Sequence, residues 1–342
     1  MQAGPPAVTV ALLLLLLPLL LLGHCAAPVS VERPDPQAAY RKMDRSALAE
    51  NQPSEVTRTP LRRHGLLNTL QPWPDETIAA LHAQVVGMPA AWSELFALAE
   101  LSYLRARQTG ARDRYLVAAI YAYAFLFPEA GSADRPSPFD PRLRQASDPS
   151  NLALAAAVTP VDDGPAVFHS GRYPLPFGTI DITVDESSLR PEGRALTSFQ
   201  PTGTLAVGGM QNQYRTPGIG ASMAASVAAP ARPAQDIQLA PRLRVPSTAL
   251  LEIPQARRQL AGGVLRGGLA IHTVFGPETV RIGDQRVPLE FDQTAARAYS
   301  LVEAQAGPMN TGASSSATSW RASRTRGLWR WSRIAVAACR WC

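Results

Sequence analysis

The spacing of hydrophobic residues changes once along this chain, and that change constrains the fold more than any other feature. Up to about residue 158, apolar side chains recur every three or four positions, which is typical of amphipathic helices. From Val167 onward they alternate with polar ones, most clearly over residues 179–184, which predicts half-buried strands. Helices first and strands afterwards indicate an α+β fold.

The helical half contains two helices that the pattern predicts most strongly, over residues 91–108 and 112–127. Their connection, Thr109-Gly110-Ala111, is short, so we expect the two to lie antiparallel. The pair looks like a tetratricopeptide-type hairpin, although no repeat of about 34 residues is visible. A further helix is predicted over residues 142–158, which Pro149 should disturb.

The second half is predicted to be rich in strands and to end in a helix. Residues 225–235 are rich in Ala and Pro and are interpreted as a loop. Strands are predicted over residues 179–184, 196–199, 205–207, 243–253, 268–275, 278–282 and 287–289, and the final helix over residues 294–303.

The N-terminal 25 residues predict export. A nearly continuous leucine run over residues 8–22 is too short to span a membrane comfortably and suits the apolar part of a signal peptide. Cys25 follows among small residues, at the place where a bacterial lipoprotein cysteine is acylated, although His24 departs from the usual small residue. We expect lipid attachment at Cys25; cleavage without lipid and a retained anchor remain alternatives.

Charge is concentrated in the last 36 residues, 307–342. This tail holds six arginines, four of the six tryptophans and no acid, and its arginines account for the whole net charge of +6. The body therefore has no net basic field to attract nucleic acid. The tail is interpreted as disordered or as the product of reading through a frameshift. The alternative is a basic, Trp-rich segment that binds a membrane surface.

A serine hydrolase requires a nucleophile, a base and an oxyanion hole. No G-x-S-x-G motif occurs, and the nearest match is Ser222 in Gly220-Ala221-Ser222-Met223-Ala224, without the strand that should precede a nucleophile. The sequence predicts no catalytic residue, and Ser222 is kept as the nucleophile of a rival hypothesis.

Metal and redox chemistry are not indicated either. The histidines show no metal-ligand spacing, and Cys339 and Cys342 form a C-x-x-C at the extreme terminus without a βαβ context. Gly262-Gly263 and Gly267-Gly268 lack the Gly-Lys-Ser/Thr of a phosphate loop. We expect no metal or other cofactor. The histidines are His24, His64, His82, His169 and His272.

Several segments together resemble the N-terminal half of esterase/lipase-type α/β-hydrolase lipoproteins of Gram-negative bacteria. The segments that carry the likeness are residues 95–103 (LFALAELSY), 121–128 (YAYAFLFP), 139–142 (FDPR), 212–215 (NQYR), 218–221 (GIGA), 287–290 (VPLE) and 294–295 (TA). The resemblance implies a parent esterase or lipase whose C-terminal domain supplies the catalytic serine, acid and histidine. No residue of this chain matches that catalytic motif, so none is carried over.

The sequence therefore predicts a signal segment over residues 1–25, a helical region over 26–160, a β-rich region over 161–306 and the tail over 307–342. We expect an envelope protein, either an outer-membrane lipoprotein or periplasmic, attached to the membrane through its N-terminal anchor. It would be a truncated relative of the hydrolases and act at most as a scaffold or interaction module for an undetermined protein partner. The rivals are an active serine esterase with an atypical nucleophile and a membrane-surface binding protein.

Overall fold

The computed structural model describes Asp35, Gln37 and residues 46–72, 74–88, 91–129, 136–162, 164–228 and 243–305. The predictions for the leucine run, Cys25 and the tail lie outside these residues. The chain divides into two compact units, Met1–Asp44 and Arg45–Cys342, and the helices and strands with bounds given below belong to the second unit.

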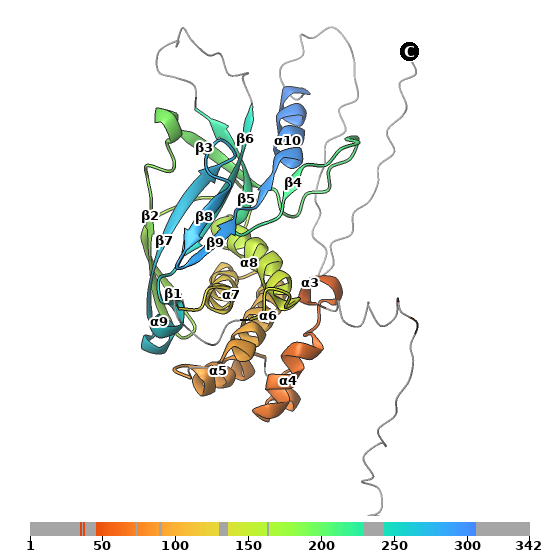
Figure 1. Cartoon of the computed structure of the whole chain (residues 1–342), viewed down its shortest axis with the longest axis vertical. Coiled ribbons are helices and arrows are strands. Elements are labelled where there is room, and N and C mark those ends of the chain that lie inside the picture. The colour runs from red at the N-terminus through yellow and green to blue at the C-terminus, as the bar shows by residue number, and fades with distance from the viewer. Residues whose placement is uncertain are drawn as a thin grey trace, which may run out of the picture. The chain divides into compact units, whose positions relative to one another are not determined.

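The first half of this unit is helical, as the spacing predicts (Figure 1). The antiparallel arrangement of α6 and α7 is confirmed, because Trp92 and Phe96 near the start of α6 both contact Phe125 near the end of α7. Tyr103 near the end of α6 correspondingly contacts Tyr115 near the start of α7. The helices are α3 (Ala47–Glu50), α4 (Glu55–Arg63), α5 (Pro74–Val85), α6 (Trp92–Thr109), α7 (Arg112–Leu126) and α8 (Arg142–Val158), with a 3₁₀ turn at Leu67–Thr69.

The second half forms a six-stranded mixed sheet in the order β1-β2-β7-β6-β5-β3. Strand β2 pairs with β7 in parallel, and the other neighbours in this sheet are antiparallel. The strands of this sheet are β1 (Gly171–Leu175), β2 (Gly178–Val184), β3 (Leu196–Pro201), β5 (Ala221–Val227), β6 (Arg244–Glu252) and β7 (Val264–Thr273). Two further pairs form small two-stranded sheets: β4 (Arg215–Thr216) with β10 (Phe291–Asp292), and β8 (Thr279–Ile282) with β9 (Gln285–Pro288).

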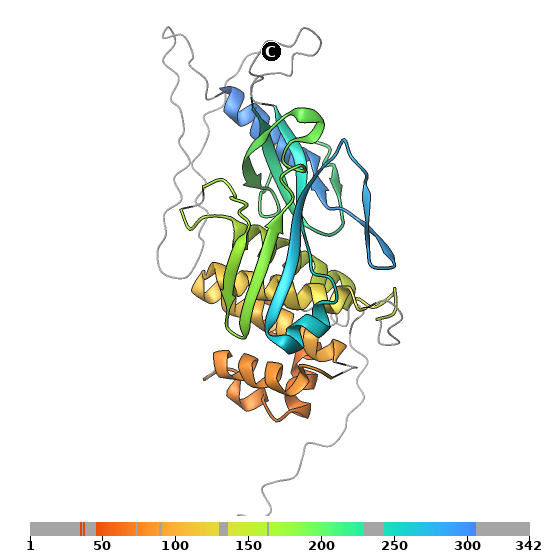
Figure 2. The same cartoon turned by 90° about the vertical axis from the view of Figure 1, so that its left-hand side faces the viewer.

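Helices and sheet share one hydrophobic core. Figure 2 shows α6, α7 and α8 crossing behind the lower part of the sheet. Helix α10 (Gln293–Gln305) packs on β5 and β6, whereas the short α9 (Ala256–Gly262) packs between β7 and α7. The α+β prediction is confirmed in this order of helices followed by strands.

One strand prediction and one loop prediction were wrong, and one edge strand was not predicted. Residues 205–207 form no strand, and Leu205 is 40% exposed, so that segment has no buried face to anchor one. The loop predicted over residues 225–235 overlaps β5, whose residues 221–225 are all buried and therefore show no alternation. Strand β1 was not predicted because it contains Pro174 and lies at the sheet edge, where proline is tolerated.

One pair of glycines brings the turn between β1 and β2 against the end of α9. Gly178 has φ +151, and a Cβ atom placed on it would lie 1.8 Å from the carbonyl oxygen of Gly263. The next amide, that of Thr179, donates to the same oxygen at 3.0 Å. Only glycine allows this approach. Gly178 therefore has a structural role in bringing this turn against the end of α9.

Candidate functional site

Ser222, the one nucleophile considered from the sequence, lies inside strand β5 and not at a strand-to-helix corner. It is 3% exposed, and its Oγ accepts hydrogen bonds from Thr202 Oγ1 at 2.6 Å and from the amide of Asp292 at 3.1 Å. A nucleophile elbow would instead present the hydroxyl at a sharp, open turn. In this structure the hydroxyl joins β5 to β10 and to the end of β3.

The structure does not bring Ser222 together with the histidines that could serve as its base. His169 is exposed in the segment before β1, where its carbonyl oxygen accepts from the Tyr173 hydroxyl at 2.7 Å. His272 lies on β7, opposite Thr248, which is in turn opposite Ser222. Two strand spacings therefore separate Ser222 from His272, about 10 Å, which is beyond hydrogen-bond reach.

The other described histidines belong to the helical region. His64 caps the end of α4, with Nε2 at 3.4 Å from Glu94 Oε1. His82 lies on α5, and its Nδ1 is 2.8 Å from the Tyr121 hydroxyl. Within the ranges that the structure describes, no group of three or more His, Cys, Asp or Glu side chains could hold a metal ion.

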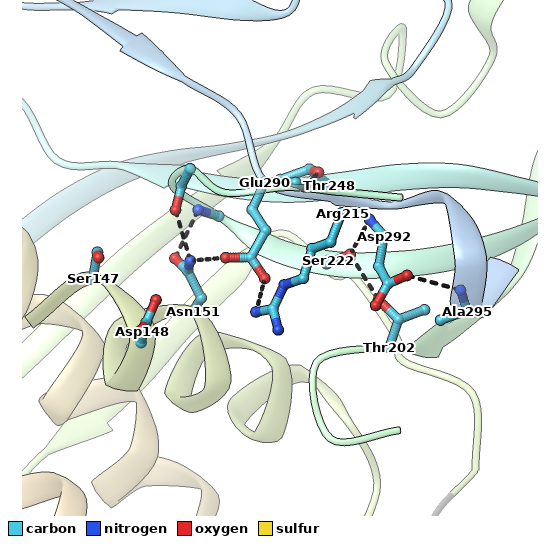
Figure 3. A network of polar contacts seen from close by, with 12 residues as sticks. Ser147, Asp148, Asn151, Thr202, Arg215, Ser222, Thr248, Glu290, Asp292 and Ala295 are labelled. Carbon is cyan, nitrogen blue, oxygen red and sulfur yellow. Dashed lines mark hydrogen bonds and ion pairs between the residues drawn. The ribbon is translucent and has the colours of Figure 1, made fainter. Parts of the chain in front are cut away.

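Next to Ser222 lies a polar network that we call the Glu290 cluster, formed by Asn151, Arg215, Gly218, Gly220 and Glu290. Figure 3 shows Asn151 reaching from α8 toward Glu290 and the segment before β5. The Asn151 amide nitrogen donates to Glu290 Oε2 at 2.6 Å and to the Gly218 carbonyl at 2.9 Å. Its amide oxygen accepts from the Gly220 N–H at 2.8 Å, so both ends of the side chain are used.

The second oxygen of Glu290 is used by an arginine. Arg215 Nη2 donates to Glu290 Oε1 at 2.6 Å, and the Arg215 side chain remains 48% exposed while that of Glu290 is 3% exposed. Burial raises the pKa of Glu290, and the charge of Arg215 and the hydrogen bonds from Arg215 and Asn151 oppose that rise. The backbone is held as well, because the Thr248 hydroxyl donates to the carbonyl oxygen of Glu290.

The Glu290 cluster joins three segments that are distant in the sequence: α8, the segment before β5 and the segment before α10. Neighbouring bonds extend it, since Asp292 Oδ1 accepts from the Ala295 amide at 2.7 Å and Thr294 Oγ1 accepts from the Tyr214 amide at 2.6 Å. A general acid or base must reach a reacting atom. Both Glu290 oxygens are bound to protein, so the arrangement is that of a structural link.

The Glu290 cluster was not predicted from the sequence, although several of the segments that form it were named there. Residues 212–215, 218–221, 287–290 and 294–295 are segments that carry the family resemblance, and the structure brings all four to the Glu290 cluster. The available signal was the presence of several polar residues in otherwise apolar segments, since a buried polar side chain requires a partner. Nothing in the spacing indicated which residues would meet.

The membrane and redox predictions concern mostly other parts of the chain. Cys25, Cys339, Cys342 and the whole basic tail lie outside the described residues. Among the helices that the structure describes, none is long and apolar enough to cross a membrane. Comparisons with family models, with curated proteins and with solved structures found no match for this chain.

Proposed function

We propose that this chain is an exported cell-envelope protein whose described part is a non-catalytic interaction module. The observation that carries the proposal is the state of Ser222: its hydroxyl is buried inside β5 and bonded to Thr202 and Asp292. A serine held in this way stabilises the sheet and has no access to a substrate carbonyl. The kinship proposed is with the N-terminal half of the esterase/lipase-type lipoproteins.

A surface beside the Glu290 cluster supports the interaction role. Tyr214 is 53% exposed, and the guanidinium of Arg297 lies 5.8 Å from the centre of its ring. Leu301 follows Arg297 by one turn on the same face of α10 and is 55% exposed. Exposed apolar side chains grouped in this way are typical of protein-interaction sites. The antiparallel packing of α6 and α7 supports, as a further part of the proposal, a tetratricopeptide-like hairpin.

The envelope location rests on the leucine run and Cys25, with lipid at Cys25 attaching the protein to a membrane. Growth of expressing cells with an alkyne-labelled palmitate tests it. We expect label on the protein that the substitution Cys25→Ser abolishes, and label that persists in this variant would contradict lipidation at Cys25.

Reaction of the purified protein with a fluorophosphonate probe tests the absence of catalysis. We expect no covalent adduct on Ser222 by peptide mass spectrometry, because its hydroxyl is buried and bonded to Thr202 and Asp292. Ser226→Ala, on the same strand, is the matched control for Ser222→Ala. An adduct on Ser222 that Ser222→Ala removes and Ser226→Ala leaves in place would establish an esterase and overturn the proposal.

A further inference from the structure

A cavity of about 360 Å³ lies in the helical region, between α5, α6, α7 and the turn that joins β1 to β2. Its size falls within the range of small-molecule sites. Each of the three helices contributes one stripe of residues at helical spacing, such as Arg114, Val117 and Tyr121 on α7. The cavity shares no residue with the Glu290 cluster.

One wall of the cavity is charged. Arg105 binds the Asp75 carboxylate with two hydrogen bonds, Nε to Oδ1 at 3.0 Å and Nη2 to Oδ2 at 2.7 Å. Arg114 donates to Asp75 Oδ1 as well, through Nη1. Two guanidinium groups against one carboxylate leave a net charge of +1. Arg114 has no other hydrogen bond within the described part of the chain, so its Nε and Nη2 remain available for a ligand.

A buried serine lines the same space. Ser102 lines the cavity from α6, is 3% exposed, and its Oγ has no hydrogen-bond partner among the described residues. A serine in the middle of a helix can donate to the carbonyl four residues earlier, and Ser102 does not. Buried polar groups of folded proteins almost always have a partner. The Ser102 hydroxyl is therefore a group beside the cavity whose hydrogen-bond partner the described residues do not supply.

The rest of the lining is largely aromatic and apolar. The His82 ring stacks on Phe177 with centroids 4.7 Å apart and an angle of 20° between the planes. Burial lowers the pKa of His82, so the imidazole is neutral near pH 7 and its contact with the Tyr121 hydroxyl adds no charge. Ile78 and Val117 complete an apolar surface that suits a hydrocarbon or aromatic group.

We propose that this cavity binds a small organic monocarboxylate with an apolar or aromatic body. Arg114 would pair with the carboxylate, and Phe177, Ile78 and Val117 would cover the body. The Ser102 hydroxyl would donate to the carboxylate after a rotation of its side chain toward the cavity. A guanidinium presents a fork of donors that matches a carboxylate. The single net positive charge matches one negative charge better than the two of a phosphate. The cavity holds the volume of about 12 water molecules, enough for an acid of that number of non-hydrogen atoms.

Calorimetric titration of the full chain with phenylacetate and with octanoate tests the proposal, since it needs neither an enzyme activity nor a partner. We expect both acids to bind, and 2-phenylethanol and inorganic phosphate to bind much more weakly. Arg114→Met should lower the affinity by about tenfold to a hundredfold, because a charge-assisted bond is lost. Ser102→Ala should lower it by up to about tenfold. Arg144→Gln, at a position 86% exposed on α8, should change nothing.

Several results would contradict the proposal that the cavity binds a monocarboxylate. Absence of binding by both acids at millimolar concentration would overturn the proposal, as would equal binding of the alcohol or phosphate. Affinities that survive both Arg114→Met and Ser102→Ala, in variants that remain folded by circular dichroism, would place the acid elsewhere. Since Ser222 lies outside the cavity, failure here leaves the proposed function untouched, and a Ser222 adduct leaves this proposal untouched.

Discussion

Two polar clusters among the described residues, the Glu290 cluster and the charged groups at the cavity, differ in how completely their groups are paired. In the Glu290 cluster, Asn151 and Glu290 are buried and every polar end of their side chains has a partner. At the cavity in the helical region, Asp75 and its arginines are partly exposed and the Ser102 hydroxyl is orphaned. Polar and charged side chains therefore link segments of the fold in the Glu290 cluster, whereas at the cavity we propose that they bind a ligand.

The difference teaches how to separate a structural network from a binding site when both are polar. A fully paired buried network stabilises and fixes the fold, whereas one left partly unpaired lowers stability. Functional sites often carry such a cost in stability. We therefore expect substitutions in the Glu290 cluster to affect folding, and substitutions at the cavity to affect binding with little loss of stability.

The largest effect should come from Asn151→Ala. The change removes two buried hydrogen bonds and a partly buried one, and it leaves the Gly220 N–H, the Gly218 carbonyl and one oxygen of Glu290 without that partner. We expect the free energy of unfolding to fall by about 3 kcal/mol or more, measured by urea denaturation. Asn212→Ala, at an exposed position, is the control and should be nearly neutral. A loss below about 1 kcal/mol for Asn151→Ala would remove the contrast between the clusters.

A smaller and opposite effect is expected for Ser102→Ala. Because its hydroxyl has no partner, removing it should leave the free energy of unfolding unchanged or raise it by up to about 1 kcal/mol. Ser54 is an equally buried serine, but it caps α4 and donates to Glu100 at 2.8 Å. Ser54→Ala should therefore lower stability by about 1 kcal/mol or more. If Ser102→Ala and Ser54→Ala lower the free energy of unfolding by the same amount, the Ser102 hydroxyl has a partner. The contrast between the two clusters would then be wrong.

The smallest effect is a difference in pH dependence. Burial raises the folded-state pKa of Glu290 above its ordinary 4.5, so its contribution to stability is present below about pH 4.5 and lost as pH rises through the folded value. The hydrogen bond from Arg105 lowers the pKa of Asp75 below 3.8, so its contribution is present above about pH 3.8 and lost as pH falls.

Urea denaturation of the protein, Glu290→Gln and Asp75→Asn over a series of pH values measures both contributions. The advantage of the unmodified protein over Glu290→Gln should shrink as pH rises from about 4 toward 7. Its advantage over Asp75→Asn should shrink as pH falls below about 4. If both stability differences change with pH in the same direction, the two clusters do not differ in their pH dependence.

The elements that were predictable are those whose pattern comes from one buried face. Helices α6, α7 and α8 agree with the predicted ranges within one residue at each end, and α8 continues through Pro149, which was expected to disturb it. Strand β2 was found from its alternation. Strand β5 was not, because small residues buried on both faces leave no alternation to read.

The candidate sites were less predictable than the elements. Asn151 and Glu290 are 139 residues apart in the sequence, and no local pattern specifies that they meet. At the cavity, Tyr121 is 1% exposed and belongs to the hydrophobic core. That it also lines a cavity depends on how α5 and the β1–β2 turn pack around it, which helical periodicity does not report.

The place of β7 in the sheet has a consequence for how the protein is made. This strand joins β2 on one side and β6 on the other, yet residues 264–273 are synthesised after both. A ribosome delivers the N-terminal strands first. Until β7 is synthesised, the β1–β2 hairpin and the β3–β5–β6 group each have an unpaired strand edge. Unpaired edges can form hydrogen bonds with another chain and lead to association of nascent chains. The interval before β7 emerges is when we expect this polypeptide to depend most on chaperones.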